Sequence, residues 1–300
     1  MTHQFRVGLI GVGTMGKGIA RNLGIKGFDL TVYDRSQAAS AGAASHGAKV
    51  AVSPAELAGN CAVILTCLPS VDAIRATFFG EQGLLNCARP GTVLVDLSTG
   101  DPVIARECAA EAASRRLFFL DAPMLRNPEA AWNGTLHLIV GGEAETLGRV
   151  RPVLEAISER IILVGSYGAG QTLKLINNAV TISNTAILCE VFEVARANGV
   201  DLQLLTEALS SSMASSKVLP SVSKRLIDDD HQPLFATDVV KKDISLYASL
   251  AEGSGCLSPI GDTVRDLVTT ASAMGYGSDH YTRIATVLEI TAKQRGDVQS

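Results

Sequence analysis

The sequence predicts an α/β protein in which a doubly wound, Rossmann-type sheet is followed by an all-α domain. Three observations carry this prediction: short aliphatic runs alternate with amphipathic helical patterns, a glycine-rich turn follows the first run, and strand signals stop near residue 165. The 300 residues suit two domains, since one domain commonly takes about 150. We therefore predict a sheet domain over residues 1–165 and a helical domain over residues 166–300.

Seven short apolar runs are the candidate strands of the sheet. Most of them are continuous rather than alternating, which is typical of parallel strands that helices cover on both faces. Amphipathic segments separate the runs, as expected of strand–helix–strand units with a largely parallel sheet. The candidate strands are residues 6–10, 30–33, 63–66, 93–96, 118–121, 136–140 and 161–164.

After residue 165 the sequence indicates helices. A helical pattern runs from Gln171 to Asn198 and Gly199, and glycine is a common helix stop. We expect this long helix to join the two domains. Further helices are expected at 202–212, 238–251 and 259–273, with loops at Pro220, 228–233 and 275–277.

Composition and charge exclude several classes of protein. Hydrophobic residues make up 47% and charged residues 19% of the chain, so intrinsic disorder is excluded. The formal net charge is −4 and no like-charged run is longer than residues 228–230, so nothing resembles a surface for nucleic-acid phosphates. The longest apolar run, residues 62–68, is too short to span a bilayer. We expect neither a nucleic-acid nor a membrane partner.

The cysteines and histidines form no pattern of disulfides or metal ligands. The cysteines lie far apart without a C-x-x-C pair, which favours reduced thiols, and the histidines show no paired spacing, so we expect no metal. The first residues lack the succession of a signal peptide, which favours a cytoplasmic protein. The residues concerned are Cys61, Cys67, Cys87, Cys108, Cys189, Cys256, His3, His46, His137, His231 and His280.

A glycine-rich turn after the first predicted strand indicates a dinucleotide site. Gly11, Gly13 and Gly16 follow the G-x-G-x-x-G pattern. The first glycine permits a tight turn, the second lets the backbone approach a pyrophosphate, the third allows close packing, and the helix N-terminus attracts the anion. The alternative is that the glycines only form a turn. The predicted cofactor contacts here are Gly11, Val12, Gly13, Thr14, Met15 and Gly16.

Asp34 ends the second predicted strand, 18 residues beyond Gly16. This is near the spacing of a carboxylate that binds ribose hydroxyls in dinucleotide-binding domains. Asp34 would repel a 2′-phosphate, whereas Arg35 can reach such a phosphate or stack on adenine. We therefore predict that residues 1–165 bind NAD, with NADP possible. The alternative is that Asp34 caps the helix that follows it.

Lys174 and Asn178 form the candidate catalytic pair. Carbonyl reduction by hydride needs a proton donor for the forming alkoxide, and in the absence of a metal this falls to Lys, His or Tyr. The two residues stand four apart in the predicted long helix, so they share one face. Alternatively, Lys174 is a solvated cation and the asparagines are polar contacts. An asparagine pair is unfavourable in an apolar helix, which favours a functional reason.

Five ordered motifs over nearly the whole chain resemble the β-hydroxyacid dehydrogenase family. They are GLIGVGTMG near the start, DLSTGDP at 96–102, the DAP and GTL-x-x-x-VGG halves of 121–142, GAGQTLKLINN at 168–178 and KKDISL at 241–246. The resemblance implies that Lys174 is the proton donor or acceptor and that Asn178 orients the substrate. It also implies that Thr99, Leu68 and Pro69 border the nicotinamide and that Lys242 closes over cofactor and substrate. Asp243 is either a further substrate residue or an ion-pair partner of Lys242.

The chain departs from the family pattern at 124–131, where relatives usually read V-S-G-G-x-x-G-A. Leu125, Arg126 and Asn127 replace the serine and glycines that present a hydroxyl and amides to a carboxylate. Arg126 can grip an anion through two hydrogen bonds, and sulfolactaldehyde reductases of this family also carry an arginine in this loop. The alternative is a surface arginine paired with Glu129.

The residues and the resemblance together predict an NAD(P)-dependent oxidoreductase. It would interconvert a small anionic β-hydroxy acid, or a hydroxyalkyl sulfonate, with its aldehyde. Residues 166–300 would serve substrate binding and oligomerisation, as a homodimer or homotetramer. The alternatives are a glyoxylate or succinic semialdehyde reductase, an imine reductase, and a non-catalytic dinucleotide-binding protein. Lys174 disfavours the last two.

Overall fold

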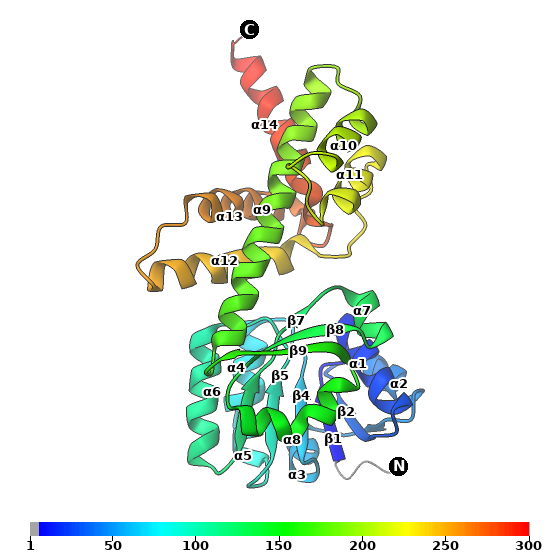
Figure 1. Ribbon diagram of the computed structural model, residues 1–300, viewed down its shortest axis with the longest axis vertical. Helices are drawn as coiled ribbons and strands as arrows, with labels where there is room; N and C mark the ends of the chain where they lie inside the picture. The colour runs from blue at the N-terminus through cyan, green and yellow to red at the C-terminus, as the bar shows by residue number, and fades with distance from the viewer. Residues whose placement is uncertain (1–5, 300) are drawn as a thin grey trace. The chain divides into compact units, whose positions relative to one another are not determined.

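The computed structural model describes residues 6–299 of the chain. The chain divides into two compact units between Lys174 and Leu175. We call the part up to Lys174 the sheet unit and the part from Leu175 the helical unit. The sheet unit holds all the strands and the helical unit is made of helices, which confirms the predicted fold class (Figure 1).

Nine strands within the described residues form one sheet in the sheet unit. Six of them pair in parallel in the order β3-β2-β1-β4-β5-β6, and β8 then runs antiparallel to β6 and pairs with both β7 and β9. In such doubly wound sheets the ligand binds where the strand order reverses, which here lies between β1 and β4. The strands are β1 (Arg6–Ile10), β2 (Asp29–Tyr33), β3 (Lys49–Val50), β4 (Val63–Thr66), β5 (Val93–Asp96), β6 (Phe118–Asp121), β7 (Met124–Leu125), β8 (Leu136–Gly141) and β9 (Ser158–Gly165).

Helices cover both faces of this sheet, which explains why its strands are continuously apolar. In β4, Val63 and Leu65 enter one core while Ile64 enters the other, as the alternation of strand side chains requires. One core contains side chains of α1 (Thr14–Ile25), α2 (Gln37–Ala44), α7 (Pro128–Asn133) and α8 (Ala144–Glu155). The other contains those of α3 (Pro54–Asn60), α4 (Val71–Phe79), α5 (Leu84–Cys87) and α6 (Pro102–Ser114).

The DLSTGDP motif leads directly from a strand into a helix. Its Asp96 ends β5, and its Asp101 caps α6 by accepting a 2.7 Å hydrogen bond from the Val103 amide. Pro102 stands in the first turn of α6, where its missing N–H costs nothing. The motif therefore places residues 97–100 in a loop at the carboxyl end of β5.

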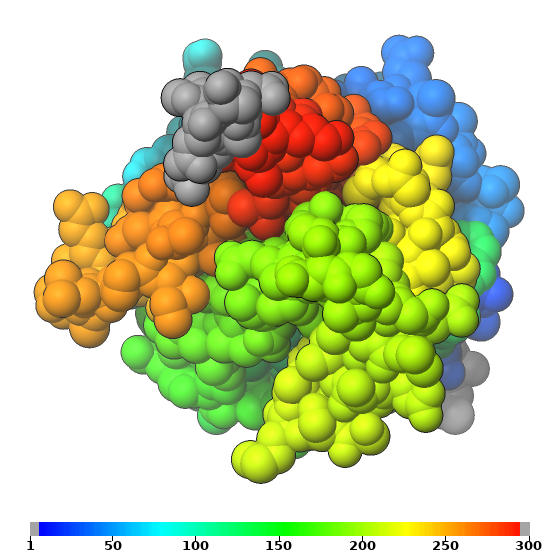
Figure 2. Space-filling model, turned by 90° about the horizontal axis from the view of Figure 1, so that it is seen from above, coloured from blue at the N-terminus to red at the C-terminus, as the bar shows by residue number. Residues whose placement is uncertain are grey.

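The helical unit packs around its own apolar core. Phe192, Ile244, Val268 and Ile284 are buried there. The α12–α13 hairpin (orange) stands out from the rest of this unit in Figures 1 and 2. The helices are α9 (Ala169–Ala197, whose first residues belong to the sheet unit), α10 (Leu202–Ser210), α11 (Leu219–Asp228), α12 (Thr237–Gly253), α13 (Pro259–Ala271) and α14 (Ile284–Gln299), with a π-helical turn η1 (Ser272–Tyr276) and a 3-10 turn η2 (Tyr281–Arg283).

The prediction of a loop at Pro220 is wrong. Helix α11 begins at Leu219, so Pro220 falls in its first turn, where proline is tolerated. The two-residue strands β3 and β7 and the helix α14 were not predicted either. Two residues are too few to show a period, and α14 has only a weak apolar face.

Helix α9 is long and apolar enough to cross a membrane by length and composition alone. Its most apolar 18-residue window has a mean hydropathy of 1.2, and 44% of that window is buried inside the protein. A core helix of a soluble protein has the same properties, so this is weak evidence for a membrane span. Buried side chains of α9 such as Ile182 and Phe192 belong to the core of the helical unit.

Candidate active site

The glycine-rich turn has the shape that a pyrophosphate site requires. Gly11 has φ +92°, and a Cβ atom there would lie 2.2 Å from the Cys67 carbonyl oxygen. A Cβ atom at Gly16 would lie 2.1 Å from the Gly11 carbonyl oxygen, whereas one at Gly13 would meet nothing within 4 Å. Among the described residues no side chain caps the N-terminus of α1, which begins at this turn. The turn therefore fits the diphosphate of a dinucleotide.

Asp34, which follows the end of β2, is hydrogen-bonded to this turn. Its Oδ2 accepts a 2.8 Å hydrogen bond from the Val12 amide, and its Oδ1 accepts one of 2.8 Å from the Ser36 amide. The cap of α2 is Ser36, whose hydroxyl accepts from the Ala39 amide, so the alternative that Asp34 caps this helix is wrong. Arg35 is exposed beside it. Asp34 and Arg35, the two residues predicted to contact the adenosine part of the cofactor, therefore both lie at the carboxyl edge of the sheet.

The loops after β4 and β5 are tied together by a buried carboxylate. Asp96 Oδ1 accepts hydrogen bonds from the Thr66 hydroxyl at 2.8 Å and the Ser98 amide at 3.0 Å, and the Ser98 hydroxyl accepts from the Leu68 amide at 2.8 Å. Burial raises the pKa of Asp96 to about 6, against the opposing effect of these bonds. Leu68, Pro69 and Thr99 thus lie in coupled loops beside the glycine-rich turn.

A second buried carboxylate holds the start of α9, the helix that carries Lys174. Asp121, at the end of β6, accepts hydrogen bonds from the Gly168 amide at 2.8 Å and the Gln171 amide at 2.9 Å. The side chain of Gln171 in turn bonds to the loop after β5. Lys174 follows Gln171 by three residues and is half-buried. Sequence reasoning missed Asp121 and Gln171, although the DAP and GAGQ motifs contained them.

In the helical unit, Asn178 and Asp243 are joined directly. Asn178 Nδ2 donates a 2.7 Å hydrogen bond to Asp243 Oδ2, and Lys242 Nζ lies 3.0 Å from Asp243 Oδ1. Asp243 is buried, with 8% of its surface exposed. The structure therefore shows the ion pair between Lys242 and Asp243 that was one of the two predicted readings. It also connects this pair to Asn178.

Arg126 pairs with a different carboxylate from the one predicted. Its Nη2 lies 2.7 Å from Glu159 Oε1, and its Nη1 donates a 3.0 Å hydrogen bond to the Thr135 carbonyl oxygen. The alternative prediction, an ion pair between Arg126 and Glu129, is therefore wrong. Glu159 takes this place because β9 pairs with β8. Glu159 also contacts His137 Nε2 at 2.9 Å, and this contact, followed by the Arg126 charge, lowers the pKa of Glu159.

The rest of the rewritten loop has structural contacts of its own. Arg126 has φ +78°, a conformation that favours the glycine usual at this position. Asn127 caps α7 by accepting a 3.1 Å hydrogen bond from the Ala130 amide, and Leu125 pairs with His137 in the β7–β8 ladder. The loop is thus fixed at both ends around the Arg126 guanidinium.

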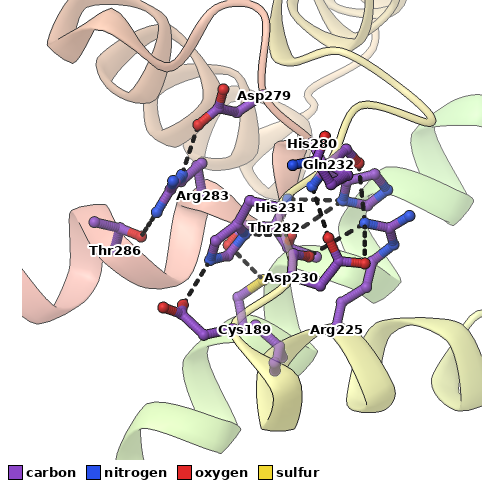
Figure 3. Close-up of polar contacts among 12 residues, drawn as sticks. Cys189, Arg225, Asp230, His231, Gln232, Asp279, His280, Thr282, Arg283 and Thr286 are labelled. Carbon is purple, nitrogen blue, oxygen red and sulfur yellow. Dashed lines mark hydrogen bonds and ion pairs between the residues drawn. The ribbon is translucent and has the colours of Figure 1, made fainter.

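Two buried histidines of the helical unit meet at one threonine (Figure 3). The Nδ1 atoms of His231 and His280 lie 2.9 Å and 3.0 Å from Thr282 Oγ1, and His231 Nε2 lies 3.0 Å from Asp229 Oδ1. Burial lowers the pKa of His280 to about 4. Among the residues whose side chains the structure describes, 6–294, no group of three or more His, Cys, Asp or Glu side chains can hold a metal ion, and His3 lies outside the described residues.

The predicted site residues fall into two groups by unit. One group, at the carboxyl edge of the sheet and the start of α9, contains the glycine-rich turn, Asp34, Arg35, Leu68, Pro69, Thr99, the loop residues Leu125, Arg126 and Asn127, and Lys174. The other, in the helical unit, contains Asn178, Lys242 and Asp243. A glycine-rich turn at the reversal point of a doubly wound sheet, with a carboxylate at the end of β2, defines a dinucleotide-binding protein.

Comparison with known proteins gives the family. Residues 6–165 match the NAD binding domain of 6-phosphogluconate dehydrogenase, and residues 168–288 match the domain described as NAD-binding of NADP-dependent 3-hydroxyisobutyrate dehydrogenase. The chain belongs to the β-hydroxyacid dehydrogenase family, as the five motifs predicted. It is an NAD(P)-dependent oxidoreductase of small hydroxy acids.

Individual relatives match over almost their whole length. The chain is 31% identical to the NAD-dependent L-serine dehydrogenase of Pseudomonas aeruginosa, over 96% of this chain and 99% of that protein. It is 28% identical to the 3-sulfolactaldehyde reductase of Escherichia coli, over 98% and 99%. The solved structure of Mycobacterium tuberculosis 3-hydroxyisobutyrate dehydrogenase with L-serine superposes with a TM-score of 0.86 at 29% identity, over 96% and 99% of the two chains.

Proposed function

We propose that this enzyme interconverts a small anionic β-hydroxy acid, or a hydroxyalkyl sulfonate, with its aldehyde, and that Lys174 is its general acid and base. The observation that carries the proposal is the attachment of the start of α9 to the loop after β5 and to Asp121 at the end of β6. Both lie at the edge of the sheet where dinucleotides bind in such folds. The attachment holds the Lys174 segment at that same edge.

The cofactor would be held by Gly11, Gly13 and Gly16 at its diphosphate and by Asp34 at its ribose. We propose NAD as the preferred cofactor, because the carboxylate of Asp34 would repel a 2′-phosphate. Thr99, Leu68 and Pro69 would border the nicotinamide, which supplies or accepts the hydride when bound. The nearby Arg35 leaves NADP as a possible second cofactor.

Lys174 would move the proton that accompanies the hydride. During reduction, its ammonium Nζ donates a proton to the oxygen of the aldehyde, and during oxidation the neutral amine takes the proton back. Asn178, one helical turn further on, would orient the substrate, and Asp243 would hold its side-chain amide. Lys242 would close over cofactor and substrate.

The anionic head of the substrate would be bound by Arg126, with Leu125 and Asn127 shaping the loop. The guanidinium already binds the carboxylate of Glu159, which shows the chemistry that it would offer to a carboxylate or sulfonate. The serine and glycines usual in the family are missing here, so a side chain has to replace them. This supports a strongly anionic substrate.

We further propose a cytoplasmic homodimer or homotetramer. Four apolar side chains of α9 within the helical unit are 44 to 58% exposed and follow a spacing of four or seven residues, which places them on one helix face. Such a stripe is typical of a surface that another subunit covers. Analytical ultracentrifugation would test the proposed oligomeric state. The four residues are Ile176, Val180, Ile187 and Val194.

The decisive experiment for the proposed reaction is Lys174→Ala. We expect turnover on C3–C4 hydroxy acids and sulfonates to fall by about 10² or more, since general acid–base catalysis commonly contributes that much. Binding of NADH, followed by its fluorescence, should be unchanged. Lys217→Ala, at an exposed lysine of the helical unit, is the matched control. Near-native turnover of Lys174→Ala would refute the assignment.

A further inference from the structure

Gln171 binds the backbone on both sides of Thr99. Its Nε2 donates a 2.8 Å hydrogen bond to the Ser98 carbonyl oxygen, and its Oε1 accepts one of 2.9 Å from the Gly100 amide. Gln171 is 1% exposed, so water does not compete for these two bonds. The loop segment that contains Thr99 is therefore fixed to the first turn of α9.

The backbone of this turn is fixed as well, through Asp121. Its carboxylate is fully buried and accepts from the Gly168 and Gln171 amides. A Cβ atom at Gly170 would lie 2.8 Å from Asp121 Oδ2, and one at Gly141 would lie 2.5 Å from Asp121 Oδ1. The two glycines thus allow the backbone to pack closely around the carboxylate, whose hydrogen bonds join the start of α9 to β6.

Lys174 follows Gln171 at a spacing of three residues, which places both on one side of α9. We propose that Gln171 is a positioning residue that sets Lys174 relative to Thr99, and hence relative to the nicotinamide end of the cofactor. This rests on the proposed function, because only that function gives Lys174 a proton to transfer. Gln171 itself touches neither the substrate nor the cofactor in this proposal.

The chemistry of the two bonds explains why a glutamine stands here. The Gly100 amide needs an acceptor and the Ser98 carbonyl oxygen needs a donor, and a primary amide supplies both from one planar group. An ionised glutamate would place an acceptor against the Ser98 carbonyl oxygen. A methionine would fill the space but leave both backbone groups unpaired in a buried site.

The test compares Gln171→Met and Gln171→Glu in the full-length enzyme, with Gln203→Met as a control at an exposed glutamine of α10. Because small displacements of a catalytic group can cost about 10² in rate, we expect kcat of Gln171→Met to fall by about 10- to 100-fold. NADH binding should change little, and the substrate KM less than kcat. The control should match the wild type.

A pH profile of Gln171→Glu provides the signature of positioning. A protonated carboxyl group has the same shape as the amide and can donate to the Ser98 carbonyl oxygen. We therefore expect kcat of this variant, relative to wild type, to rise as the pH is lowered. If kcat of Gln171→Glu is impaired and its ratio to the wild-type kcat does not change with pH, the proposal is overturned. This measurement also serves if Gln171→Met fails to fold.

The double variant Gln171→Met/Lys174→Ala separates this inference from the proposed function. If Gln171 acts through Lys174, Gln171→Met should cost little in the Lys174→Ala background, because the two effects are not additive. An equal loss in both backgrounds would overturn the role of Gln171 and leave the role of Lys174 intact. Wild-type turnover of Lys174→Ala alone would instead refute the proposed function.

Discussion

The side-chain amide of Asn178 donates a 2.7 Å hydrogen bond to the carboxylate of Asp243, 65 residues further along the chain. A carboxylate only accepts, so this contact fixes which end of the amide faces Asp243. The Asn178 side-chain oxygen accepts a 3.3 Å hydrogen bond from the side-chain Nδ2 of Asn177. Lys242 Nζ pairs with the other oxygen of this carboxylate. Asp243 therefore orients Asn178.

Asp243→Asn should weaken the alignment of Asn178 and lower kcat/KM. A hydrogen bond to a charged group is worth about 1.5 to 3 kcal/mol, which corresponds to a loss of roughly 10- to 100-fold. Steady-state kinetics measure the loss, and Asp72→Asn, at an exposed aspartate of α4, is the control. Unchanged kinetics would show that Asn178 keeps its orientation without the carboxylate.

Asp34→Asn should reduce the preference for NAD over NADP. The substitution removes the repulsion of a 2′-phosphate and leaves Arg35 free to contact it. It also weakens the bond to the Val12 amide, so efficiency with NADH should fall as well. The ratio of kcat/KM for NADH and NADPH is the measurement. A wild type that already prefers NADPH strongly would contradict the assignment to Asp34, and Arg35→Ala would then abolish that preference.

Arg126→Ala should lower kcat/KM for anionic substrates by about one to two orders of magnitude, since one charged hydrogen-bonding partner is worth about 1.5 to 3 kcal/mol. Arg126→Lys should recover only part, because an ammonium cannot reproduce the planar guanidinium. A neutral aldehyde of similar size is the internal control. Equal losses on anionic and neutral substrates would mean that Arg126 holds the loop through Thr135 and Glu159.

Glu159→Gln should raise kcat/KM for anionic substrates, whereas Arg126→Ala should lower it. The carboxylate of Glu159 competes with an anionic substrate for Arg126, so its neutralisation should lower KM for anionic substrates and leave kcat unchanged. Glu155→Gln, at an exposed glutamate of the same unit, is the control. A higher KM would show that Glu159 prepares Arg126 for the substrate instead of competing with it.

His280 should destabilise the fold in acid. Its pKa is about 4 in the folded protein against an ordinary value of 6.5, so the unfolded chain binds more protons between these values. The free energy of unfolding should therefore fall as the pH drops through this window, by roughly 2 to 3 kcal/mol from this group. Asp96 acts oppositely, because its raised pKa of about 6 favours the folded state as the pH falls from 6 towards 3.8.

The contribution of His280 is isolated by His280→Asn. An asparagine can still accept from the Thr282 amide but does not titrate. Thermal unfolding at pH 7.5 and pH 5 should show a smaller acid loss in this variant than in the wild type or in His46→Asn, at an exposed histidine. An equal acid loss in all three proteins would assign the pH dependence to other groups.

The fold class and the glycine-rich turn could be predicted from the order of the residues alone. Continuous apolar strands, amphipathic helical patterns and the spacing of Gly11, Gly13 and Gly16 are local signals, and each depends on residues within a few positions of one another. The same locality explains the errors. The two-residue strands β3 and β7 carry no period, and Pro220 is compatible with either a loop or the first turn of a helix.

The partners of the site residues could not be predicted in this way, because they depend on the tertiary structure. Arg126 meets Glu159 because β7 and β9 both pair with β8, whose register with β9 shifts beside Glu159. Asn178 meets Asp243 because two helices that are distant in the sequence pack together. Gln171 reaches Ser98 and Gly100 because β5 and β6 end side by side next to the start of α9. These contacts join residues 33 to 73 positions apart. Their geometry follows from strand register and helix packing, which local periodicity does not encode.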